Sequence, residues 1–245
     1  MGSFDQNMPA NPVAELPSEP LESIPSLTVD CVIFGLSDKR LKTLLVKHAI
    51  GDSKGEWGLP GGVVYTKESL EEAASRMLGD LTGVQGIYME QLQAFGDVER
   101  AGSEKRVITL AFFALVQPEH YELAISSDAS DAIWCDVKER PELIFDHDKI
   151  VDVGIAYLRR RIRYKPIGVN LLPAKFTLGQ LQELYEAILD EKLDKPNFRR
   201  KMLRINFLVC CNETQDNVPH RAGVLYRFDQ ENYDLLCDKG FSFEF

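Results

Sequence analysis

A glycine-rich loop followed by an amphipathic helix constrains this chain more than any other feature. The loop is Trp57-Gly-Leu-Pro-Gly-Gly62, and apolar residues then recur with helical spacing over residues 67–82. Gly83 provides a stop, because glycine accepts the left-handed conformation that ends many helices. Glycines let a backbone approach a ligand closely, and amides at a helix N-terminus attract anions. The pattern predicts an anion-binding loop before a helix whose apolar face is Leu70, Ala74, Met77, Leu78 and Leu81.

The whole chain divides into three parts. Residues 1–26 contain five prolines and few large apolar residues, which is typical of a flexible tail. Residues 27–163 mix strand-like runs with a few helices, which favours an α+β domain over a regular βαβ alternation. Residues 164–245 form a second domain, because Pro166 does not continue the preceding helix. In the first domain we expect strands over residues 27–34, 41–46, 88–95, 106–116 and 132–136, and a second helix over 146–161.

Hydropathy and cysteine usage disfavour several classes of protein. No apolar run reaches the roughly 18 residues of a membrane-spanning helix, and we find no secretory signal pattern. The five cysteines include no C-x-x-C pair, which disfavours a zinc ribbon or a disulfide framework. We therefore expect a cytoplasmic protein with reduced thiols and no membrane partner.

The net charge of −10 conceals an asymmetry between the two halves of the chain. Residues 1–158 carry 13 Lys and Arg against 26 Asp and Glu. Residues 159–227 carry 14 basic against 7 acidic residues. An acidic domain joined to a basic one indicates two different tasks, and the basic one is suited to phosphates.

A spaced set of residues extends the glycine-rich loop through the helix and past its end: Gly62, Glu68, Arg76, Leu78, Gly83 and Val84. This set matches the frame of the Nudix signature, and residues 27–160 resemble a Nudix domain. The glutamates that hold divalent metal in the family are replaced, with Met77 after the arginine and Asp80-Leu81 in place of a Glu-Glu pair. Mg²⁺ needs several oxygen ligands, which Met and Leu do not provide. The resemblance implies an α/β/α sandwich with a mixed sheet, and we predict no catalytic residue, no metal and no required cofactor.

The segment from Glu90 to Arg100, continued by the strand that starts at Arg106, is similar to the ligand-holding segment of ADP-ribose-type Nudix domains. Arginine pairs with phosphate oxygens bidentately, and the resemblance implies ADP-ribose or a related NAD-derived metabolite as effector. Core packing is the alternative role for the aromatic candidates, and for Arg76 we favour an ion pair with Glu68 or Asp80. The candidate ligand-binding residues are Trp57, Gly61, Gly62, Glu68, Arg76, Phe95, Arg100, Arg106 and Trp134.

The second domain begins with a clear helix-start signal. Thr177 and Gln180 have the spacing of a capping box, and Pro196 suits the first turn of a following helix. Basic residues surround the apolar stripe of that helix, and strand-like runs follow at 207–211 and 223–228. Helix, turn, basic helix and hairpin is the order of a winged helix-turn-helix domain.

Residues 172–201 resemble the winged helix of the NrtR family, Nudix-related transcriptional repressors of NAD metabolism, and of related sugar-responsive regulators. A recognition helix places its N-terminal part at base edges, while other cations hold phosphates. A solvated helix face is the alternative role for such a charge cluster. Helix-turn-helix proteins usually bind palindromic sites as two-fold dimers, so we expect a homodimer on a palindromic operator in double-stranded DNA. The candidate DNA-binding residues are Lys175, Thr177, Asn197, Arg199, Arg200, Lys201, Arg204, His220 and Arg221.

Two classes of function follow from these patterns. In the first, the chain is a transcriptional regulator, expected to repress genes of NAD metabolism, and its Nudix domain binds ADP-ribose without hydrolysing it. A sugar such as arabinose is an alternative effector for the same class. In the second, the chain is an active ADP-ribose pyrophosphatase-like hydrolase with an accessory C-terminal module. An unorthodox Mg²⁺ site would then be formed by Glu68, Glu71, Glu72 and Asp80.

Overall fold

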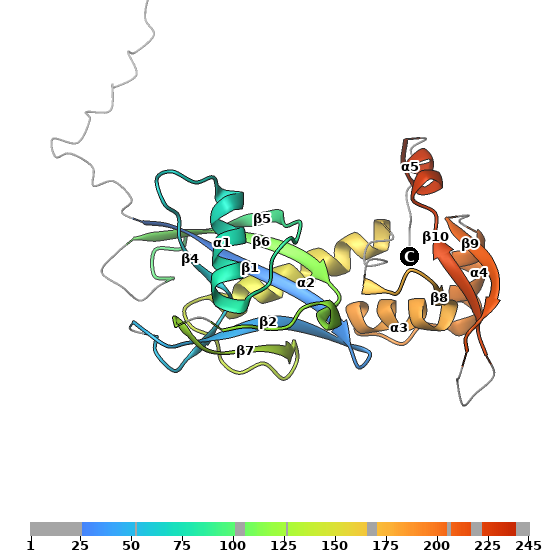
Figure 1. The fold of residues 1–245 in the computed structure, drawn as a ribbon. Coiled ribbons are helices and arrows are strands. Elements are labelled where there is room, and N and C mark those ends of the chain that lie inside the picture. Colours follow the sequence, from blue (N-terminus) through green and yellow to red (C-terminus); the bar gives the residue numbers. More distant parts are fainter. Residues whose placement is uncertain are drawn as a thin grey trace, which may run out of the picture.

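The fold consists of two lobes joined by a long helix (Figure 1). It is taken from a computed structural model of the whole chain. Among the residues that the structure describes, no helix is long and apolar enough to cross a membrane. The structure describes residues 26–51, 53–100, 106–125, 127–165, 171–204, 207–216 and 222–238.

The first lobe is built on a mixed sheet. Its central strands β1 and β6 run parallel, whereas the other neighbouring strands pair antiparallel, in the order β3-β2-β1-β6-β5 with β4 on β1 and β7 on β2. A tight hairpin joins β1 to β2, with Asp38 and Lys39 both at positive φ. The strands are β1 Ser26–Ser37, β2 Arg40–His48, β3 Trp57–Gly58, β4 Gly61–Val63, β5 Glu90–Phe95, β6 Val107–Val116 and β7 Ala129–Asp136.

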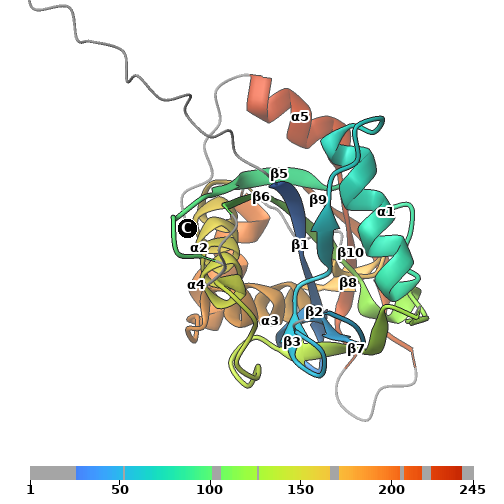
Figure 2. The ribbon, with the colours of Figure 1, turned by 90° about the vertical axis from the view of Figure 1, so that its left-hand side faces the viewer.

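Two helices cover opposite faces of this sheet, α1 (Leu70–Thr82) and α2 (His147–Tyr164). Figure 2 shows them on either side of β1. Successive side chains of a strand point to opposite faces, so Cys31 and Ile33 pack in the same apolar cluster as α1 residues, and Val32 and Phe34 in that of α2. The predicted α/β/α sandwich with a mixed sheet is confirmed.

Local signals fix the ends of α1. Ser69 and Glu72 form a reciprocal capping box at its start, three residues later than the predicted start at 67. Gly83 ends the helix at φ 76°, as predicted from its sequence position. A side chain at position 83 would also meet Ala124, since a Cβ there would lie 2.9 Å from the Ala124 Cβ.

The second lobe has the predicted winged helix-turn-helix order. Thr177 caps α3 with Gln180 in a capping box, as expected. Inside the lobe, the Tyr185 and Phe198 rings of the two main helices meet edge to face, 5.4 Å apart. A terminal helix, α5, was not predicted. The elements are β8 Phe176–Thr177, α3 Leu178–Leu189, α4 Lys195–Arg204, β9 Leu208–Thr214, β10 Val224–Phe228 and α5 Gln230–Asp238.

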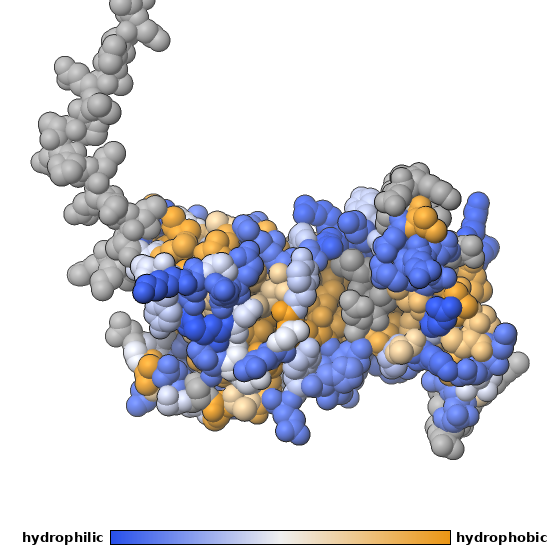
Figure 3. Space-filling view, turned by 45° about the horizontal axis from the view of Figure 1, so that its top comes forward, coloured by the Kyte–Doolittle hydropathy of each residue, from blue (hydrophilic) through white to orange (hydrophobic). Residues whose placement is uncertain are grey.

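The two lobes share one apolar core in this conformation. Leu158 and Ile162 of α2 belong to the same buried cluster as Leu181, Leu184 and Ile188 of α3. In the space-filling view of Figure 3, apolar residues lie between the lobes while hydrophilic residues cover much of the outer surface. A change at the end of α2 therefore reaches the second lobe through direct packing.

Candidate functional sites

The glycine-rich loop packs against a carboxylate of the central strand. Gly61 pairs with Asp30 across β4 and β1, and a Cβ at position 61 would lie 2.1 Å from the Asp30 Oδ1 atom. A Cβ at position 62 would lie 2.6 Å from the Met77 Cε atom. Gly61 is therefore required by close packing, since a Cβ there would also lie 2.6 Å from the Val29 carbonyl oxygen, whereas at Gly62 only the flexible Met77 side chain would have to move.

An ion pair joins the loop after β4 to helix α1. The Arg76 Nη2 atom lies 2.6 Å from the Glu68 Oε1 atom, and its Nε atom donates to Oε2 over 2.9 Å. The hydrogen bonds from Arg76, together with one from the Tyr65 amide, lower the pKa of Glu68 to about 2. The guanidinium also lies 4.3 Å from the centre of the Tyr65 ring. The geometry agrees with the structural ion pair that we favoured for Arg76.

Two of the three positions where Nudix glutamates are replaced, Met77 and Leu81, pack against other residues of the lobe. Met77 fills the space beside Gly62, and Leu81 is 4% exposed in an apolar cluster with Val46. Asp80 is exposed and lies 4.0 Å from Arg76. Of the other acids considered for Mg²⁺, Glu72 is engaged in capping α1. Within the described ranges, no three His, Cys, Asp or Glu side chains are grouped as a metal site requires.

Arg100 lies inside the lobe rather than on its surface. Its Nε atom donates to both Asp146 carboxylate oxygens over 3.0 Å, and its Nη2 atom to Oδ1 over 2.7 Å. The same Nη2 atom lies 3.5 Å from the Asp30 Oδ2 atom, and the Arg100 side chain is 4% exposed. In this structure the guanidinium is paired with two carboxylates, and the phosphate contact expected for Arg100 stays a prediction.

His147 completes this buried group and was not predicted. Its Nδ1 atom accepts a hydrogen bond from the Leu59 amide over 2.9 Å, so in the neutral ring the proton is on Nε2, which lies 3.6 Å from Asp30. Burial lowers the pKa of nearby His48, and the neighbouring His147 lowers it further. The one sequence signal for this group was Asp30, a lone carboxylate within an apolar strand.

The remaining ligand candidates occupy different environments. Phe95 is 4% exposed in the apolar core, which is the packing role rather than the stacking role. Arg106 donates to the carbonyl oxygens of Asp97 and Gly96. Trp57 is half-buried with the Lys47 ammonium 5.7 Å from its ring centre. The Trp134 Nε1 atom is buried without a hydrogen-bond partner among the described residues.

The DNA-binding candidates gather on the second lobe. Arg199 and Arg204 are exposed on α4, and Arg200 donates to the Asn197 side chain. A hollow of about 490 Å³ along α4 is lined by Asn197, Arg200, Lys201 and Arg204, among others. The side chain of Lys201 is half-buried.

Two further candidates are engaged within the second lobe. Lys175 pairs with Glu213 on β9 over 2.7 Å. Thr177 is 8% exposed, and its hydroxyl group caps α3, so we do not place it against DNA. His220 and Arg221 lie outside the described residues.

Comparison with known protein families finds a matching domain for each lobe. Residues 25–153 match the NUDIX domain, and residues 168–228 match the NrtR DNA-binding winged helix domain. The chain is 32% identical over 216 residues to the ADPR-responsive transcriptional repressor NtrR of Acinetobacter baylyi, covering 86% of this chain and 85% of that protein.

Two solved structures from Shewanella oneidensis are also similar. NrtR complexed with a 27mer DNA superposes with a TM-score of 0.70 at 28% identity, covering 85% of this chain and 95% of that one. The NUDIX domain of NrtR complexed with ADP ribose has a TM-score of 0.52 at 32% identity, covering 56% and 90%. Fold and matches together define a Nudix-domain protein that carries a DNA-binding winged helix domain. The chain belongs to the NrtR family.

Proposed function

We propose that this protein is a transcriptional repressor that responds to ADP-ribose and controls genes of NAD metabolism. The observation that carries the proposal is the union of a Nudix lobe with replaced metal-ligand positions and a winged helix lobe with a basic recognition helix. The relative from Acinetobacter baylyi is an ADPR-responsive repressor. A ligand changes DNA binding only through its different affinity for the two states of the protein.

On the Nudix side, we propose binding without hydrolysis. Hydrolysis of a diphosphate needs several carboxylates around a divalent cation. Here Glu68 is held by Arg76 and Leu81 is buried. Met77 occupies a position where the family signature has a glutamate, and its side chain packs against Gly62. These contacts support a sensor domain over the alternative of an active pyrophosphatase.

On the DNA side, we propose that α4 enters the major groove. Arg199 and Arg204 lie on its exposed surface and suit guanine edges or phosphates. The apolar side of the helix is fixed by Phe198 and Met202, which are buried in the core. A two-fold homodimer on a palindromic operator agrees with the usual assembly of helix-turn-helix proteins.

The test is fluorescence anisotropy with DNA from the upstream intergenic region, titrated with and without ADP-ribose. We expect specific binding whose affinity changes when ADP-ribose is added, and no such change with arabinose. Absence of specific binding at moderate salt would overturn the proposal. A parallel assay measures Mg²⁺-dependent release of AMP from ADP-ribose, with the Glu68→Gln variant as the matched control. Release above that control would instead support the hydrolase.

A further inference from the structure

The turn of the helix-turn-helix has one well-defined geometry. Asp190 ends α3 in the left-handed conformation at φ 60°, and its amide donates to the Glu186 carbonyl over 2.9 Å. The Glu186 side chain accepts hydrogen bonds from the Leu193 amide over 3.1 Å and from Lys192 over 2.8 Å. Gln182 donates to the Leu193 carbonyl over 3.0 Å. These hydrogen bonds attach the turn to α3.

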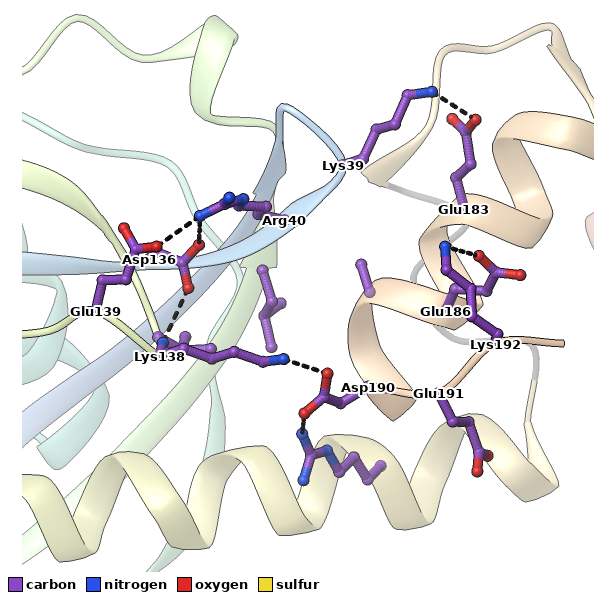
Figure 4. A pocket seen from close by; sticks show the side chains of 14 residues that line it. Lys39, Arg40, Asp136, Lys138, Glu139, Glu183, Glu186, Asp190, Glu191 and Lys192 are labelled. Atoms are coloured by element: carbon purple, nitrogen blue, oxygen red, sulfur yellow. Dashed lines mark hydrogen bonds and ion pairs between the residues drawn. The ribbon is translucent and has the colours of Figure 1, made fainter.

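The carboxylate of Asp190 points away from its own lobe and is held by the Nudix lobe. Lys138, in the segment after β7, donates to the Asp190 Oδ1 atom (Figure 4). The Arg159 Nη2 atom of α2 lies 3.8 Å from Oδ2, and its Nε atom donates to the Ile188 carbonyl over 2.9 Å. These three side chains line a polar groove of about 550 Å³ between the lobes.

The two partners of Asp190 lie on different parts of the Nudix lobe. Lys138 follows β7, which carries Trp134. Arg159 lies on α2, whose first residue is His147 and whose preceding residue Asp146 holds Arg100. At a rise of 1.5 Å per residue, α2 spans about 18 Å from His147 to Arg159. Helix α2 thus connects the buried group around Arg100 with the turn before the recognition helix.

We infer that Asp190, held by Lys138 and Arg159, is the contact through which the Nudix domain orients the recognition helix and transmits the effect of its ligand. The transmission step rests on the proposed function. The Lys138 and Asp190 side chains are 60% and 44% exposed. An ion pair of that exposure changes an equilibrium constant by up to about fivefold, which is comparable to the coupling between sites in many regulators. The contact is therefore weak enough for a ligand to shift.

The test compares Asp190→Asn and Lys138→Gln with the wild-type protein. Asparagine tolerates the left-handed conformation, so Asp190→Asn removes the charge without straining the turn. Asp194→Asn is the matched control, because Asp194 lies in the same turn and caps the Asn197 amide within its own lobe. For each protein, the affinity for operator DNA is measured with and without ADP-ribose, and ADP-ribose binding is measured by calorimetry.

We expect Asp190→Asn and Lys138→Gln to bind ADP-ribose as the wild type does. We expect the effect of ADP-ribose on DNA affinity to fall about two- to fivefold in both, with Asp194→Asn unchanged. An unchanged effect in both variants would overturn the inference. If the wild type itself shows no response to ADP-ribose, the proposed function fails instead. Hydrogen exchange at the Leu193 amide then tests the contact: faster exchange in Lys138→Gln supports it, and equal exchange overturns it.

Discussion

Replacing Arg100 by methionine tests whether the buried ion pairs or a ligand contact explain this residue. Methionine has a similar volume, so the change removes the charge without opening a large cavity. Asp30 and Asp146 would then remain without their cation, and the Asp30 side chain is only 7% exposed. Breaking a buried ion pair by removing one partner costs about 3–5 kcal/mol.

The expected loss is large enough to measure by thermal unfolding. For a chain of this size, each kcal/mol lowers the melting temperature by about 2–4 °C, so Arg100→Met should melt about 6–20 °C lower. Arg106→Met is the matched control, because Arg106 donates only to backbone carbonyls in the described structure. Loss of such hydrogen bonds costs about 1 kcal/mol, or a few degrees.

Circular dichroism melts of both variants at neutral pH would be paired with calorimetric titration of ADP-ribose. The reasoning requires a clearly larger fall in melting temperature for Arg100→Met than for Arg106→Met. Equal melting temperatures, combined with loss of ADP-ribose binding in Arg100→Met, would refute it. Arg100 would then be a ligand contact, as the resemblance of this segment implies. Its pairing with Asp146 would then make no measurable contribution to the melting temperature.

Three further predictions follow from contacts in each lobe. Arg76 lowers the pKa of Glu68 to about 2. The contribution of this ion pair to folding stability should therefore be complete above the ordinary pKa near 4.5 and be lost as the pH falls through 2. Carboxyl NMR should find Glu68 ionised at pH 3.5, and a titration midpoint near 4.5 would contradict the pairing. Arg204→Ala should weaken binding to all DNA sequences alike and reduce the salt slope by about one, whereas a base-dependent loss would indicate direct recognition. Phe198→Ala should destabilise the winged helix lobe by about 3–5 kcal/mol, measured by urea unfolding, because this ring is 2% exposed against Tyr185.

Interactions between residues close in the chain were visible in the sequence. The capping box of Thr177 and Gln180 and the stop at Gly83 were both predicted and are both present. The same holds for the apolar face of α1, because helical periodicity depends only on spacing. The start of α1 was misplaced by three residues. The short helix α5 was not predicted at all, and its apolar residues form only a weak stripe.

The partners of charged residues that are distant in the chain were decided by the tertiary structure. The sequence shows a guanidinium at Arg100, but Asp146, which neutralises it, is 46 residues away. The link from Lys138 to Asp190 likewise joins two lobes across 52 residues. Local patterns report on neighbours within a turn or two, whereas the partner of a charge depends on which distant segments pack together.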